Sequence, residues 1–215
     1  TMLNSLSTKF LITLSLFLNI TILQSQKSDI WSDDNFTGLE FRSIGPALMS
    51  GRISDIAIHP EDENTWYVTV GSGNVWKTQN SGITWDPIFD DQASYSIGCV
   101  SIDPNNPEVV WIGTGEDQGG RHFGYGDGVY KSLDGGKNWT NMGLKNSERI
   151  SKILIHPKNS NIVWVAVQGP LWSSGGQRGL YKTVDGGKNW KLVLKDNKWT
   201  GATEVILDPS NNKVM

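Results

Sequence analysis

Short apolar segments recur along the chain and are separated by polar turns. The segments at 53–58 and 150–155 are rich in β-branched residues and end at a proline, which cannot continue a central strand. Second apolar segments lie at 66–70, 109–113 and 162–167. Because no segment beyond the first 25 residues has a convincing helical period, the pattern predicts an all-β fold.

Two motifs alternate along the chain with a period of about fifty residues. The first aligns without gaps at residues 75–85, 129–139 and 180–190, and the second is an Ile/Leu-x-Pro at 58–60, 102–104, 155–157 and 207–209. The first motif supplies a third strand, and the residues after its closing Trp supply a fourth. Four antiparallel strands in each repeated unit are typical of a β-propeller blade.

Each copy of the first motif has Ser or Thr, then Asp or Asn two residues on, then Gly and finally Trp. This order suits a tight hairpin in which the carboxylate binds backbone N–H groups, Gly supplies positive φ and Trp tucks beneath the turn. Residues that recur in every unit are predicted to be structural: Asn80, Gly82, Trp85, Asp134, Gly136, Trp139, Asp185, Gly187 and Trp190. The aromatic residues of the strands are predicted to be core: Trp66, Trp76, Trp111, Tyr130, Trp164 and Tyr181.

The repeats divide the chain into blades at about 51–92, 93–146 and 147–198, with residues 201–215 beginning another. Since propellers usually close with four to eight blades, this count predicts an N-terminal fragment of a longer protein.

The N-terminal segment 1–25 has one lysine, an apolar run at 10–23 and a polar end, which is typical of a secretory signal peptide. An uncleaved membrane anchor is the alternative, although the run is shorter than the roughly 20 residues of a membrane span. Residues 26–50 would form a lead-in to the first blade. We therefore expect export to the periplasm, the cell surface or the medium.

Composition excludes several classes of function. Nineteen Lys and Arg face 22 Asp and Glu, so the chain lacks the basic character of a nucleic-acid-binding protein. A single cysteine, Cys99, excludes internal disulfides and a cysteine-based zinc site. No nucleotide, metal or dinucleotide motif is present, so neither a cofactor nor a metal is expected.

The loops at one end of an up-and-down blade are alike in every repeat, whereas the loops at the other end differ between repeats. Both repeated motifs lie at one end, whereas the loops between second and third strands and the connections between blades lie at the other end. At that variable end, the stretches 115–127, 169–178 and 195–199 stand out. Glu116 and Asp117 in the first stretch are weak catalytic candidates. The ligand-binding candidates in the three stretches are Arg121, His122, Tyr125, Trp172 and Trp199.

Carboxylates beside exposed Trp suit a cleft for a polysaccharide or oligosaccharide, and two carboxylates at a suitable separation could hydrolyse a glycosidic bond. The alternative is that these Gly-rich loops are only solvated, or pack on further blades.

The repeated turn resembles the Asp-box, or bacterial neuraminidase repeat, with all its residues at Asp134 and Asp185 and with Asn80 replacing Asp in the first copy. The segment 41–53 is similar to exported bacterial proteins with a sortilin-like N-terminal propeller, often labelled glycosyl hydrolases, and this resemblance covers about residues 39–215. It implies glycan binding or xyloglucanase-like hydrolysis. A sortilin-like propeller that binds a protein or peptide without catalysis is the alternative, and a structural scaffold is a third.

The sequence departs from the enzymes among these relatives. Gly71 stands where the resemblance to xyloglucanases would place a catalytic Asp, and the arginine triad of a sialidase cannot be assembled. The resemblance therefore implies the fold more strongly than any one activity.

Overall fold

The computed structural model describes residues 38, 51–117, 123–211 and 214–215, which contain three four-stranded antiparallel sheets. The first sheet comprises β1 (Ile53–His59), β2 (Asp62–Val70), β3 (Asn74–Thr78) and β4 (Asp86–Pro87). The second comprises β5 (Ile97–Ile102), β6 (Val110–Thr114), β7 (Val129–Ser132) and β8 (Thr140–Asn141). The third comprises β9 (Ile150–His156), β10 (Asn159–Val167), β11 (Gly179–Thr183) and β12 (Lys191–Leu194). The expected signal peptide (1–25) and almost all of the lead-in (26–50) lie outside the described residues.

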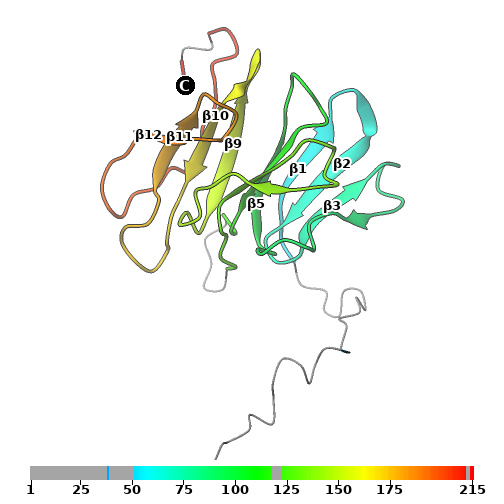
Figure 1. The fold of residues 1–215 in the computed structure, drawn as a ribbon, viewed down its shortest axis with the longest axis horizontal. Coiled ribbons are helices and arrows are strands. Elements are labelled where there is room, and N and C mark those ends of the chain that lie inside the picture. The colour runs from blue at the N-terminus through cyan, green and yellow to red at the C-terminus, as the bar shows by residue number, and fades with distance from the viewer. Residues whose placement is uncertain (1–37, 39–50, 118–122, 212–213) are drawn as a thin grey trace, which may run out of the picture. The chain divides into compact units, whose positions relative to one another are not determined.

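Each sheet is a meander, and the first strands of successive sheets lie side by side, β1 beside β5 and β5 beside β9 (Figure 1). One apolar cluster fills the space between the first two sheets, with Tyr67 and Tyr130 among its buried members. A second cluster fills the space between the second and third sheets around Trp111 and Val165. Sheets stacked face to face around their innermost strands are the architecture of a β-propeller, which confirms the predicted fold class. In the described part of the chain, no helix is long and apolar enough to span a membrane.

A lysine covers an aromatic ring at the same place in every sheet. Across the second and third strands, Tyr67 pairs with Lys77, Trp111 with Lys131 and Trp164 with Lys182. The lysine Nζ lies 5.1, 4.7 and 4.9 Å from the respective ring centroid. A cation over an aromatic face is favourable, so this pair is a repeated element of the stack.

The equivalence of Tyr67 to Trp111 corrects the prediction for Trp66, which lies one residue earlier and therefore faces the opposite side of the sheet. Trp66 and Trp76 are half-buried and line an apolar hollow of about 320 Å³ on the outer face of the first sheet. Tyr130, which is equivalent to Trp76, is only 4% exposed because the preceding sheet covers it. Trp66 and Trp76 are therefore not core residues in the described structure.

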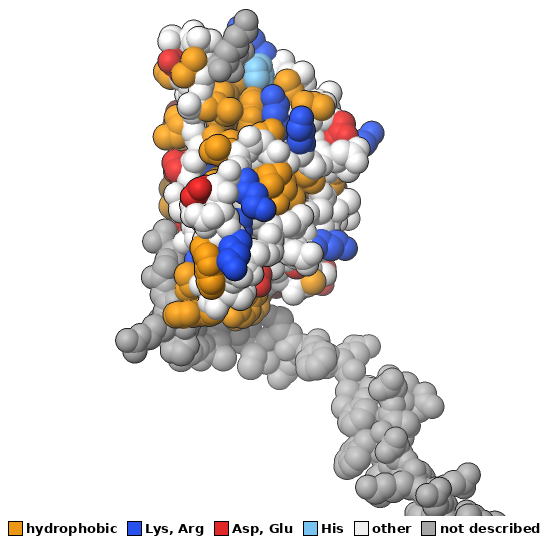
Figure 2. All heavy atoms as spheres, turned by 90° about the vertical axis from the view of Figure 1, so that its left-hand side faces the viewer, with side chains coloured by type: hydrophobic (Ala, Val, Ile, Leu, Met, Phe, Trp, Pro, Cys, Tyr) orange, Lys and Arg blue, Asp and Glu red, His pale blue; other side chains and the backbone are white. Residues whose placement is uncertain are grey.

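The third sheet also carries exposed apolar side chains on its last strand, Val193 and Leu194. Figure 2 views the side of the molecule where this sheet lies and shows hydrophobic side chains interspersed with Lys and Arg. The segment after residue 200 covers part of this sheet, with Val205 packed against Trp164 and Leu180. Residues 201–208 form no strand, so the start of another blade in this segment stays a prediction.

The repeated turns share one hydrogen-bond pattern. Ser132 Oγ donates to Asp134 Oδ1 at 2.8 Å, and Asn138 donates to both carboxylate oxygens from its backbone N at 2.9 Å and from Nδ2 at 2.7 Å. Asp185 accepts the same set from Thr183 and Asn189. These hydrogen bonds favour the charged carboxylate and lower the pKa of Asp134 and of Asp185 to about 2.

In the second and third sheets, the Trp that closes the motif also links its sheet to the preceding one. Trp139 still lies beside its own turn, since a Cβ on Gly136 would be 3.5 Å from Trp139 Cζ2. Trp139 Nε1 donates to the Ile88 carbonyl at 2.7 Å, and Trp190 Nε1 donates to the Met142 carbonyl at 2.8 Å. Both acceptors lie just after the last strand of the preceding sheet. Trp85 belongs to the first sheet and instead donates to Gly82 of its own turn at 3.0 Å.

Replacing Trp190 by Phe should therefore destabilise the protein more than the same change at Trp85. Loss of the hydrogen bond to Met142 costs about 1 kcal/mol in the free energy of unfolding, with a further loss from reduced packing. Urea denaturation of Trp190→Phe and Trp85→Phe measures the difference. Equal losses in the two variants would contradict a linking role for Trp190.

Acid should weaken the turns. The folded pKa of Asp134 and Asp185, about 2, lies below the ordinary value of 3.8, so the unfolded chain binds more protons and stability falls as pH drops from about 4 to 2. The double variant Asp134→Asn/Asp185→Asn should show a shallower fall in thermal midpoint over that range. Glu61→Gln, which changes an exposed carboxylate, is the control and should keep the wild-type slope. An unchanged slope in the double variant would show that Asp134 and Asp185 do not cause the loss of stability in acid.

Candidate functional site

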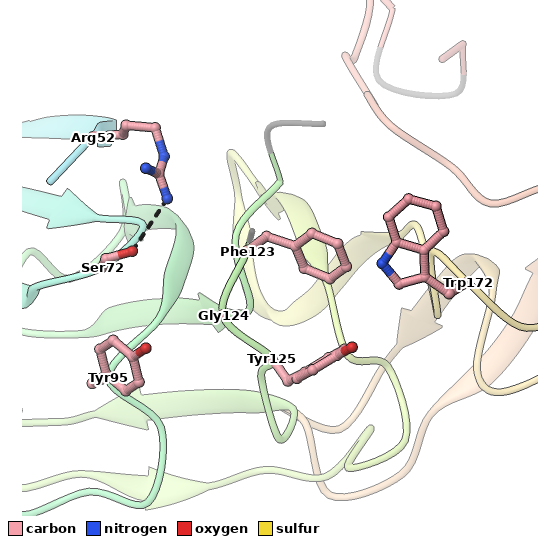
Figure 3. A pocket seen from close by; sticks show the side chains of 7 residues that line it. All are labelled: Arg52, Ser72, Tyr95, Phe123, Gly124, Tyr125 and Trp172. Atoms are coloured by element: carbon pink, nitrogen blue, oxygen red, sulfur yellow. Dashed lines mark hydrogen bonds between the residues drawn. The ribbon is translucent and has the colours of Figure 1, made fainter. Parts of the chain in front are cut away.

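The end of the sheets opposite the repeated turns bears a hollow of about 410 Å³. Its lining comes from five segments: the start of β1, the β2–β3 turn, the connection between the first two sheets, the β6–β7 loop and the β10–β11 loop. The residues that line it are Arg52, Ser72, Tyr95, Phe123, Gly124, Tyr125 and Trp172 (Figure 3). The fold thus brings together Tyr125 and Trp172, two candidates that are 47 positions apart in the sequence.

Aromatic side chains dominate the rim of this hollow. Tyr95, Tyr125 and Trp172 are 60%, 59% and 68% exposed. Phe123 packs edge-to-face on Tyr125, with ring centroids 5.4 Å apart, and thereby fixes one wall. Exposed aromatic rings beside hydroxyl groups and a guanidinium can bind a ligand that has both apolar faces and hydroxyls.

Tyr95 was not among the sequence candidates. It lies in the connection between blades, between the small polar residues Ser94 and Ser96, and not in one of the long loops. A lone large aromatic residue at the variable end of a blade was the signal that could have identified it.

Arg52 and Glu116 form an ion pair at the edge of the hollow. Arg52 Nη2 donates to Glu116 Oε2 at 2.7 Å and Nε donates to Oε1, so the guanidinium binds the carboxylate through two hydrogen bonds. The pair raises the pKa of Arg52 through the hydrogen bond and the charge of Glu116. The Glu116 side chain is 3% exposed and the Arg52 side chain 51%. Arg52 Nη2 also reaches Ser72 Oγ at 3.2 Å, so Glu116 orients a guanidinium that lines the hollow.

Glu116 also occupies the space beside Gly71. A Cβ on Gly71 would lie 3.0 Å from Glu116 Cδ, which leaves little room for a side chain at this position. The position where the resemblance would place a catalytic Asp is thus bordered by a carboxylate from the next sheet. A catalytic role for Glu116 or Asp117 stays a prediction.

The other candidates lie elsewhere. The Asp117 carbonyl accepts a hydrogen bond from Gln168 Nε2 at 3.1 Å and so joins the second and third blades. Trp199 is exposed and lines a separate, smaller hollow of about 160 Å³, whereas Trp172 lines the larger one. Arg121 and His122 lie outside the described residues. Within the described ranges, no three His, Cys, Asp or Glu side chains gather as a metal site would require. Burial raises the pKa of the Cys99 thiol, which suits a core residue.

Glu116→Gln should lower stability by about 1–3 kcal/mol, because the buried side chain loses its charge and presents an NH₂ or a single oxygen to Arg52. Chemical denaturation of the variant beside Glu204→Gln, a carboxylate outside this pair, measures the effect. Unchanged stability of Glu116→Gln would mean that the ion pair does not hold this edge together.

No family model matches the chain. Among curated proteins, it is 23% identical over 211 residues to a probable oligoxyloglucan-reducing end-specific xyloglucanase of Neosartorya fischeri, covering 72% of this chain and 25% of that protein. It is likewise 23% identical over 201 residues to a xyloglucanase of Acetivibrio thermocellus, covering 80% of this chain and 22% of that protein. The chain thus spans about a quarter of the length of the curated relatives it matches.

Among solved structures, an ancestral GH74 enzyme superimposes with a TM-score of 0.51 at 20% identity, covering 68% of this chain and 19% of that one. This likeness supports the propeller fold. Together, the comparisons show remote homology between this chain and the GH74 xyloglucanases.

Proposed function

We propose that this chain provides a glycan-binding surface of a carbohydrate-active β-propeller protein. The observation that carries the proposal is the hollow ringed by Tyr95, Tyr125 and Trp172, at the end where blade loops differ. Pyranose rings present C–H faces that stack on aromatic side chains, and their hydroxyls bind groups such as Arg52 and Ser72. Remote homology to xyloglucanases supports a glycan as the ligand.

Binding is better supported than hydrolysis by the described residues. Glycoside hydrolysis needs two carboxyl groups on either side of the scissile bond. No carboxylate of the described residues lines the 410 Å³ hollow, and Glu116 beside it is paired with Arg52. The proposal therefore assigns this surface to recognition, and hydrolysis would need acids from other parts of the protein.

Three further parts of the proposal rest on sequence. We infer that the repeated turns are Asp-boxes, that the chain belongs to a longer propeller, and that it is exported through residues 1–25. The turn hydrogen bonds at Asp134 and Asp185 support the first of these. The exposed apolar side chains of the first and third sheets support the second.

Affinity electrophoresis of the full-length protein in xyloglucan, mixed-linkage β-glucan and other soluble polysaccharides tests the function. The wild type should be retarded by at least one of them, and Trp172→Ala or Tyr95→Ala should weaken binding about tenfold or more, which is about 1.4 kcal/mol. Leu133→Ala removes a similarly exposed apolar side chain, 67% exposed, from the opposite end and should bind as the wild type does.

Retardation by no polysaccharide would overturn the proposal. Saturable binding of a peptide library in place of any glycan would favour the sortilin-like alternative.

A further inference from the structure

Two buried arginines line the small hollow that contains Trp199. Arg149 and Arg178 are each 5% exposed, and the hollow measures about 160 Å³. Within the described part of the chain, no ion pair joins either guanidinium to a carboxylate. A buried charge without a counter-ion is costly, so two together need an explanation.

Arg178 is satisfied by backbone carbonyls alone. Its Nε and both terminal nitrogens donate hydrogen bonds to the carbonyl oxygens of Gln168, Pro170, Ser173, Gly175 and Trp199. The guanidinium therefore shapes the β10–β11 loop and fixes the backbone of Trp199. Its donors are used, but no carboxylate of the described residues forms an ion pair with it.

Arg149 differs because it keeps donors to spare. Its Nε donates to the Gly169 carbonyl at 3.0 Å, and its Cζ lies 5.4 Å from the centroid of the Phe123 ring. Neither terminal nitrogen donates to another of the described residues, although the side chain lines the hollow. Two adjacent nitrogens of a guanidinium match the two oxygens of a carboxylate.

The two guanidinium groups of the hollow act on each other. Burial, and then the charge of Arg178, lower the pKa of Arg149, whereas Glu148 and Asp117 act in the opposite direction. A bound anion would offset the repulsion between the two guanidinium groups.

We propose that Arg149 binds the carboxylate of an acidic saccharide, a uronic acid residue, whose ring lies against Trp199. The proposal rests on the proposed glycan-binding function and names the class of glycan. Trp199 is 58% exposed and supplies a flat apolar wall, and Thr203 lines the same hollow with a hydroxyl for a ring substituent. The hollow is too small for a polymer, so it fits one charged group and part of its ring.

Isothermal titration calorimetry of the full-length protein with a galacturonic acid oligomer and with the galactose oligomer of the same length tests the site. The wild type should bind the acidic oligomer at least tenfold more tightly, and added salt should weaken that preference. Arg149→Gln should remove the preference and leave binding of the neutral oligomer unchanged. Arg149→Lys keeps the positive charge but lacks the two adjacent nitrogens that bind both carboxylate oxygens. This variant should therefore retain only part of the preference for the acidic oligomer.

Two other variants serve as a charge control and as a second test of the site. Lys195→Gln removes the same charge from an exposed position outside the hollow and should bind as the wild type does. Trp199→Ala should weaken the acidic oligomer even if Arg149→Gln does not fold, which thermal unfolding would reveal.

The outcomes separate this proposal from the broader one. Equal binding of acidic and neutral oligomers, or an unchanged preference in Arg149→Gln and Trp199→Ala, would overturn the acidic-saccharide site and leave glycan binding intact. Binding of no saccharide would overturn both proposals. Inorganic sulfate that competes as strongly as the oligomer would show a simple anion site and overturn the assignment to a saccharide.

Discussion

The structure depends on the packing of one sheet against the next. Each four-stranded sheet has two apolar faces, and neither face can be buried within the sheet itself. The interior between sheets is filled by rings such as Tyr67 and Trp111, which a lysine covers from the neighbouring strand. Indole N–H groups of Trp139 and Trp190 then tie each sheet to the one before it. The first sheet follows no other sheet among the described residues, and its Trp66 and Trp76 lie half-buried in an apolar hollow.

This stacking also determines where ligands can bind. Because every sheet starts at its innermost strand and runs outward, all the β2–β3-type loops and all the connections between sheets gather at one end. The turns at the other end are fixed by the same carboxylate or amide hydrogen bonds in each copy. The variable end is therefore where side chains differ between blades. It holds the aromatic hollow, the Arg52–Glu116 pair and the two buried arginines.

The periodic features were predictable from sequence, because each was visible several times over. Strand order, the repeated turn and the all-β class follow from motifs that recur in every blade. Features that occur once were harder to predict. The pairing of Arg52 with Glu116 joins residues 64 positions apart, and Tyr95 lies in a short connection with no motif around it. The residue type of Trp66, the same as that of Trp111, predicts a core position, whereas a shift of one residue turns Trp66 to the other face of its sheet.

The position of a bound glycan tests the account most directly. A crystal structure of the full-length protein with a bound oligosaccharide would locate the sugar rings relative to the two ends of the blades. The account predicts sugar rings against Tyr95, Tyr125 or Trp172 at the variable end. A glycan bound at the repeated turns, or on an outer sheet face, with the hollow at the variable end empty, would contradict it.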